Sequence, residues 1–143
     1  MHKQEVTYSL PTGASWYNFY NKKAIATNVK DDNEWVTVTL SDLEQAVFVR
    51  AGSILPILLH ADCMSLLSCY ENDISLEVYL GEARNATGVL YIDDGSSYDY
   101  DSSEDKRAYL TYSVDAGVLI TTSEQGSLPY NAAPAIASVA IYG

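Results

Sequence analysis

Carboxylates are the side chains of this 143-residue chain that are best suited to chemistry. Four lie close together in the second half of the sequence: Asp93, Asp94, Asp99 and Asp101. A glycosidase needs two carboxylates that converge on one bond. Adjacent residues of a strand point to opposite faces, so Asp93 and Asp94 are poorly placed to share a substrate. We expect Asp93, Asp94 and Gly95 to form a turn. A calcium site shared by the four aspartates is the alternative, because calcium prefers oxygen ligands.

Other catalytic chemistries lack the residues that they need. His2 and His60 are the only histidines, and no Gly-x-Ser-x-Gly elbow is present, which argues against a serine hydrolase triad. No glycine-rich phosphate loop occurs. Cys63 and Cys69 either close a small disulfide loop or remain two buried thiols, and with His60 they form no recognised zinc site. We therefore predict no catalytic residue, no cofactor and no metal in this chain.

Two clusters of aromatic residues are candidates for sugar contact. The first cluster comprises Trp16, Tyr17, Phe19 and Tyr20, and the second comprises Tyr91, Tyr98 and Tyr100. Aromatic side chains bury large areas, so we expect both clusters to pack in a core or against a neighbouring domain. The alternative is sugar contact, for which the candidates are Trp16, Tyr17, Tyr98 and Tyr100, and it would make a glycan a partner of the chain.

A sequon for N-glycosylation is present at Asn85, where Asn-Ala-Thr falls in an expected surface loop after Gly81. The sequon has a role only if the chain enters the secretory pathway.

The composition is that of an acidic chain with enough apolar residues for a core. Hydrophobic residues make up 48% of the sequence, and the formal net charge is −11. Nucleic acids and anionic membranes bind clustered Lys and Arg, so neither is an expected partner. The longest apolar stretch, residues 54–59, is interrupted by Pro56 and is too short to cross a bilayer.

The elements that must position these residues are strands. Apolar and polar residues alternate with a period of two, which is typical of half-buried strands. The alternation is clearest at residues 6–10, 35–40, 76–80 and 110–114. Within the second of these stretches, we expect Val36, Val38 and Leu40 to share one face. The spacing of strands and turns, without intervening helices, predicts an all-β fold, an antiparallel β-sandwich.

A boundary is predicted where the alternation is lost, in the stretch that carries both cysteines. We predict a proximal β-domain over residues 1–58, a linker over residues 59–74 and a smaller distal β-domain over residues 75–143.

Three segments carry a more specific signal. They are residues 8–20 (YSLPTGASWYNFY), residues 47–56 (VFVRAGSILP) and residues 88–100 (GVLYIDDGSSYDY). In this order they resemble segments of the proximal and distal C-terminal β-domains of glycoside hydrolase family 31. The resemblance spans nearly the whole chain and is similar in detail to the α-glucosidase and glucosidase II branch. Members of that branch remove α-linked glucose with retention of configuration.

The resemblance implies an accessory part and not a complete enzyme. In this family both catalytic carboxylates lie on a (β/α)8 barrel that precedes this region, and the nucleophile stands in a Trp-x-Asp-x-Asn-Glu signature. Neither Trp16 nor Trp35 begins that signature, so no catalytic residue can be carried over. The family's distal domain often continues past the position that matches Gly143, so we expect the distal unit to be incomplete.

The expected function is that of a non-catalytic C-terminal region of a retaining α-glucosidase, whose partner is the catalytic (β/α)8 barrel of the same parent protein. The region would pack on this barrel and stabilise it. The resemblance favours the secretory pathway, in the endoplasmic reticulum, the lysosome or the cell exterior. The alternative is a free-standing carbohydrate-binding or structural assembly module.

Overall fold

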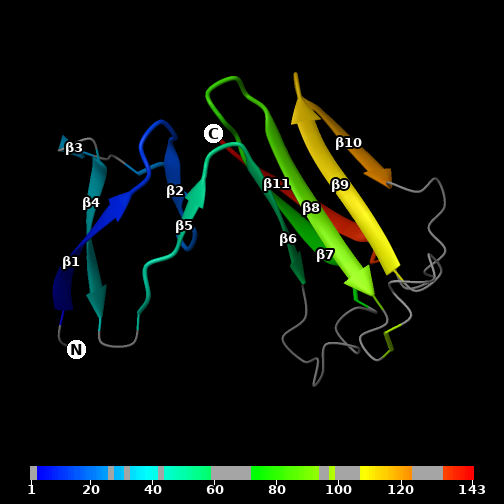
Figure 1. The fold of residues 1–143 in the computed structure, drawn as a ribbon, viewed down its shortest axis with the longest axis horizontal. Coiled ribbons are helices and arrows are strands. Elements are labelled where there is room, and N and C mark those ends of the chain that lie inside the picture. The colour runs from blue at the N-terminus through cyan, green and yellow to red at the C-terminus, as the bar shows by residue number, and fades with distance from the viewer. Residues whose placement is uncertain are drawn as a thin grey trace. The chain divides into compact units, whose positions relative to one another are not determined.

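The computed structural model describes residues 3–25, 28–30, 33–41, 44–58, 72–93, 97–98, 107–123 and 134–143. The regular elements of these residues are eleven β-strands, which confirms the predicted all-β class (Figure 1). None of the described segments forms a helix able to cross a membrane.

Tertiary contacts divide the chain into two units. Unit 1 comprises residues 1–51 with Gly143, and unit 2 comprises residues 52–142. The predicted domains, 1–58 and 75–143 with a linker at 59–74, stay a prediction. Most of that linker lies outside the described residues.

Unit 1 contains two small antiparallel sheets. The three-stranded sheet has the order β1 (Lys3–Leu10), β4 (Asn33–Ser41) and β3 (Asn28–Lys30), and the two-stranded sheet pairs β2 (Trp16–Asn18) with β5 (Phe48–Arg50). The rings of Tyr8 and Phe48 meet edge to face with their centroids 5.5 Å apart. This contact joins the two sheets, because Tyr8 belongs to β1 and Phe48 to β5.

The core of unit 1 follows from the alternation on its two long strands. Val6 and Tyr8 of β1 lie opposite Val38 and Val36 of β4, so these side chains share one face of the sheet. Leu40 lies on the same face, as predicted. Among the described residues of this unit, the buried apolar ones are Leu10, Tyr17, Val36 and Val49.

Unit 2 is built on one six-stranded sheet. Its strands are β6 (Ser53–Leu58), β7 (Ile74–Tyr79), β8 (Ala86–Asp93), β9 (Arg107–Asp115), β10 (Val118–Ser123) and β11 (Ile136–Tyr142). Their order in space is β10-β9-β8-β6-β7-β11. β11 runs parallel to β7, β6 meets β8 in parallel at Ser53 and Thr87, and the other pairs are antiparallel. The sheet is therefore mixed, which alternation cannot predict because it reports faces and not strand direction.

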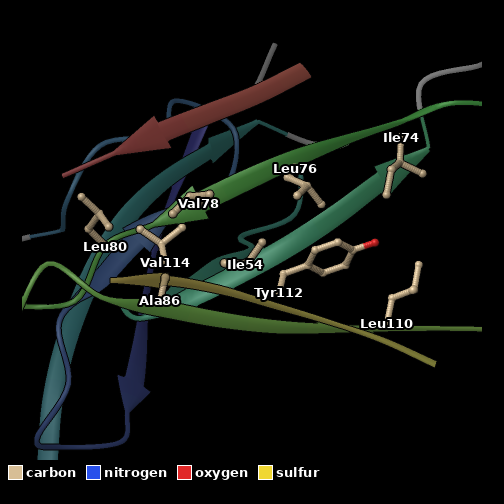
Figure 2. Close-up of a cluster of buried hydrophobic side chains, with 9 residues drawn as sticks. All are labelled: Ile54, Ile74, Leu76, Val78, Leu80, Ala86, Leu110, Tyr112 and Val114. Atoms are coloured by element: carbon tan, nitrogen blue, oxygen red, sulfur yellow. The ribbon is translucent and has the colours of Figure 1, made fainter. Parts of the chain in front are cut away.

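The core of unit 2 lies between facing strands of this sheet. Figure 2 shows side chains of β7 pointing toward those of β9. Every second residue of β9 is buried, from Ala108 to Val114, as one face on a core requires. β7 differs, since five of its six residues are buried and both of its faces are covered. The buried cluster comprises Ile54, Ile74, Leu76, Val78, Leu80, Ala86, Leu110, Tyr112 and Val114.

The backbones of β6 and β8 approach closely at Gly88. A Cβ atom on Gly88 would overlap the carbonyl oxygen of Ile54 and would lie 2.8 Å from the Ile54 Cβ. Next to it, the Thr87 N–H donates a 2.9 Å hydrogen bond to the Gly52 carbonyl. The absence of a side chain at Gly88 therefore allows the two strands to lie this close.

Side chains as well as the backbone ladder hold β11 to β7. The hydroxyls of Ser75 and Ser138 share a 2.9 Å hydrogen bond, and the rings of Tyr79 and Tyr142 lie 5.1 Å apart. The Tyr79 hydroxyl donates to Glu77 Oε2 at 2.7 Å. Burial, together with this carboxylate, raises the pKa of Tyr79 well above its usual value.

Candidate functional site

The predicted sugar-contact residues fall into different environments. Trp16 is half-buried, and its indole N–H donates to the Pro11 carbonyl at 3.3 Å. Tyr17 is only 7% exposed and belongs to the core of unit 1, where a ring offers little surface to a ligand. Tyr98, in unit 2, is 88% exposed, and Tyr100 lies outside the described residues. Sugar contact by these four residues stays a prediction.

The sequon residue Asn85 is exposed, in the loop between β7 and β8. This loop is closed by two 2.9 Å hydrogen bonds, from the Gly81 N–H to the Asn85 carbonyl and from the Arg84 N–H to the Gly81 carbonyl. An exposed Asn85 on a well-formed loop is accessible to modification, and its glycosylation stays a prediction.

The predicted cysteine and aspartate features lie mainly beyond the described residues. Cys63 and Cys69 both fall there, as do Asp94, Asp99 and Asp101. Within the part of the chain that the structure describes, no three His, Cys, Asp or Glu side chains gather in a way that could hold a metal ion. The disulfide between Cys63 and Cys69 and the alternative of a calcium site therefore stay predictions.

A hollow of about 560 Å³ is present in unit 1. The turn that follows β2, the end of β4 and the segment before β5 form its wall. The lining residues are Asn18, Tyr20, Asn21, Val38, Thr39, Leu40, Glu44, Gln45 and Ala46. Volumes of 300–1,000 Å³ are typical of small-molecule sites, so this hollow is large enough for a ligand.

Tyr20 stands in this wall on a turn that short-range contacts hold in place. Asn18 Oδ1 accepts hydrogen bonds from the N–H groups of Tyr20 at 2.9 Å and Asn21 at 3.1 Å. The Phe19 ring lies edge-on to the Tyr20 ring at 5.5 Å, and the Lys22 ammonium lies 4.1 Å from the centre of the Phe19 ring. The Tyr20 ring is nevertheless 61% exposed. It is a supported but accessible aromatic surface.

Glu44 adds an ionised group to the same wall. Its Oε2 accepts a 2.8 Å hydrogen bond from the Ser41 N–H, and its own N–H donates to the Ser41 carbonyl at 3.0 Å. The backbone hydrogen bond from Ser41 lowers the pKa of Glu44 below its usual value. Glu44 therefore carries its negative charge at neutral pH.

Sequence reasoning did not select Tyr20 or Glu44 as site residues. Tyr20 lies in the first aromatic cluster, and a signal was available, because Asn18 and Asn21 are residues that favour turns. A tyrosine on a turn is more exposed than one in a strand that faces a core. Nothing near Glu44 in the sequence indicates that it lies beside Tyr20.

In unit 2, one face of the sheet is apolar and exposed. Tyr91 of β8 and Tyr109 of β9 are opposite each other, and the hydroxyls of Thr111 and Thr122 share a 2.7 Å hydrogen bond beside them. We call this surface the outer face of β8–β9–β10. Its large apolar residues, each 38–58% exposed, are Val89, Tyr91, Tyr109, Val118 and Ile120. A sheet face of this kind is typical of a contact with another domain.

Comparison with known proteins identifies the family. Residues 1–55 match the glycosyl hydrolase family 31 C-terminal domain. The chain is 30% identical over 128 residues to an α-glucosidase of Schizosaccharomyces pombe, an alignment that covers 90% of the chain. It is also 30% identical over 119 residues, or 83% of its length, to an α-xylosidase of Saccharolobus solfataricus. The chain is a C-terminal domain of glycoside hydrolase family 31.

Structural comparison supports the same family. The fold is similar to that of ER glucosidase II, solved as a heterodimeric complex of a catalytic subunit and the binding domain of a regulatory subunit. The TM-score is 0.63 at 25% identity, over 86% of this chain and 12% of that one. The chain likewise spans only 12% of the α-glucosidase and 15% of the α-xylosidase. It therefore corresponds to one region of much larger proteins.

Proposed function

We propose that this family 31 domain is a non-catalytic accessory region of a retaining α-glucosidase, and that it packs on the catalytic (β/α)8 barrel and stabilises it. The observation that carries the proposal is the coverage. An alignment over 90% of the chain accounts for only 12% of an α-glucosidase. The chain also lacks the Trp-x-Asp-x-Asn-Glu signature that the resemblance associates with the nucleophile.

The outer face of β8–β9–β10 supports a packing role. Its side chains are large, apolar and exposed, and they lie on the side of the sheet opposite to the core of unit 2. Burying such a face against a second domain removes apolar area from water, which stabilises both partners. We propose this face as the contact with the rest of the parent enzyme.

The first experiment tests the absence of catalysis. The purified 143-residue chain is incubated with maltose and with an aryl α-xyloside, and release of sugar is measured. We expect no turnover above the rate without protein. Turnover at rates typical of enzymes would contradict the accessory role.

A second experiment tests the packing role in the full-length parent. Tyr91→Glu places a charge in the outer face, and Tyr98→Glu is the matched control at a tyrosine that is 88% exposed. We expect Tyr91→Glu to lower the melting temperature of the parent enzyme and to leave that of the isolated chain unchanged within about 2 °C. Equal effects of the two substitutions on the parent would overturn the proposed contact.

We also propose a substrate and a cellular compartment for the parent protein. An α-glucoside is favoured by the α-glucosidase relative and by the likeness to glucosidase II, and assays of the parent on matched α-glucoside and α-xyloside test this choice.

The secretory pathway is favoured because the similar solved structure is that of an ER enzyme and because Asn85 is exposed. In secreted protein, we expect a glycan at Asn85 that adds mass and is removed by an N-glycosidase. The Asn85→Gln variant should lack this added mass. An unmodified Asn85 in secreted protein would remove that support.

A further inference from the structure

We propose that the hollow of unit 1 binds a neutral saccharide, with the Tyr20 ring as a stacking surface and Glu44 as a hydroxyl acceptor. This binding site goes beyond the accessory role and does not depend on it. The hollow belongs to unit 1 alone, whereas the proposed contact with the parent enzyme lies on unit 2.

The mixture of groups in the wall suits a sugar. A pyranose ring presents C–H groups on its faces and hydroxyls around its rim, so it needs an apolar surface beside hydrogen-bonding groups. Tyr20 supplies the apolar surface, and Asn21, Gln45 and Glu44 supply amide and carboxylate groups. A carboxylate can accept about four hydrogen bonds, so the bond from Ser41 leaves capacity for ligand hydroxyls.

The charges of the wall and of the chain select against other ligands. Glu44 is ionised, and the chain carries a formal net charge of −11, so phosphates and acidic sugars would be repelled. An organic cation is usually caged by several aromatic faces. In this hollow Tyr20 is the one aromatic residue among those described as lining it. A neutral, hydroxyl-rich ligand suits the groups of the wall.

The supporting contacts reduce the cost of binding. The turn at Asn18, the edge contact of Phe19 and the hydrogen bonds between Glu44 and Ser41 fix both groups before a ligand arrives. Groups that are already held in place lose less conformational entropy on binding.

The test uses the complete 143-residue chain labelled with ¹⁵N, titrated with maltotriose and followed by amide chemical shifts. We expect the largest shifts at residues 18–21 and 44–46. Tyr20→Ala should weaken binding by about tenfold, because it removes the stacking surface, and Glu44→Gln by a smaller factor. Tyr109→Ala, the same substitution at an exposed tyrosine of β9 in unit 2, should leave binding unchanged.

Thermal melting of each variant checks folding, and Tyr20→Phe, which keeps the ring, should retain binding in full. No shift at the highest soluble maltotriose concentration would overturn the proposal. It would also be overturned if the shifts were unchanged by Tyr20→Ala, if they centred on Tyr98, or if tetramethylammonium bound in place of the sugar. The proposed accessory role would survive each of these results, since its tests measure turnover and the stability of the parent.

Discussion

Unit 2 and unit 1 hold their strands together by different means. Unit 2 uses one contiguous apolar cluster beneath β6, β7, β8 and β9. Among the residues that the structure describes, unit 1 has fewer buried apolar side chains, and polar side chains fix its turns by bonding to backbone N–H groups. Asn18 and Glu44 do so beside the hollow, and Glu34 Oε1 accepts from the Gly13 N–H at 3.3 Å. Local hydrogen bonds of this kind order a loop without filling the space around it. A wall held by such bonds leaves room for the hollow of unit 1.

Leu76→Ala is the substitution expected to have the largest effect on this comparison. Leu76 is 0% exposed at the centre of the unit 2 cluster, and removing its side chain leaves a cavity. We expect the free energy of unfolding to fall by about 3 kcal/mol. Urea denaturation measures it, with Val49→Ala in the core of unit 1 as the comparison. A loss for Leu76→Ala below that for Val49→Ala would break the distinction between the two cores.

Gly88→Ala tests the close approach of two strands in unit 2. The added methyl group meets the Ile54 backbone, so β8 must move away from β6. Overpacking of this kind costs about 2 kcal/mol. Thermal or urea unfolding detects the change, and Thr87→Ala, at the exposed neighbouring position, is the control. Equal stability of the two variants would show that the strands separate without cost.

Asn18→Ala tests the polar support of unit 1. The substitution removes the oxygen that accepts from the N–H groups of Tyr20 and Asn21. We expect a loss of about 1 kcal/mol, because this arrangement resembles a helix cap in its energetics. Faster hydrogen exchange at the Tyr20 and Asn21 amides would locate the effect. Asn18→Asp keeps the acceptor oxygen and should restore protection; if it does not, the hydrogen bonds are not the cause.

The smallest effect on stability at neutral pH is expected from the ionisation of the buried tyrosines of unit 2. Burial raises the pKa of Tyr79 and of Tyr112 above the usual value. Below about pH 10 both the folded and the unfolded chain keep these protons, and above it the unfolded chain releases them first, so stability falls as pH rises. Urea midpoints at neutral and strongly alkaline pH measure this loss. Tyr79→Phe should flatten the alkaline decline, and an unchanged decline would exclude Tyr79 as its source.

Alternation in the sequence was sufficient to predict four of the strands, β1, β4, β7 and β9, and to predict faces of β4 and β9. The pattern at residues 35–40 placed Val36, Val38 and Leu40 on one side of β4, and the pattern at residues 110–114 located the buried face of β9. These features depend on side-chain direction along a single strand, which is a local property. The family resemblance rests on residues that are also local, and the comparisons confirm it.

The segment at residues 47–56 shows what only the tertiary structure decided. In the sequence it is one continuous motif of the family, but in the structure Phe48–Arg50 pairs with β2 of unit 1 and Ser53–Leu58 pairs with β7 of unit 2. Gly52, with φ +85°, stands between the two strands in a conformation that favours glycine.

The parallel pairing of β11 with β7 and the meeting of Tyr20 with Glu44 in one hollow belong to the same class of feature. The sequence by itself determined the strands with clear alternation, the side chains that share a face within them, and the family. The partners of each strand and the walls of the hollow arise between segments far apart in the chain. A local pattern carries no information about such contacts, because they depend on how the whole chain packs.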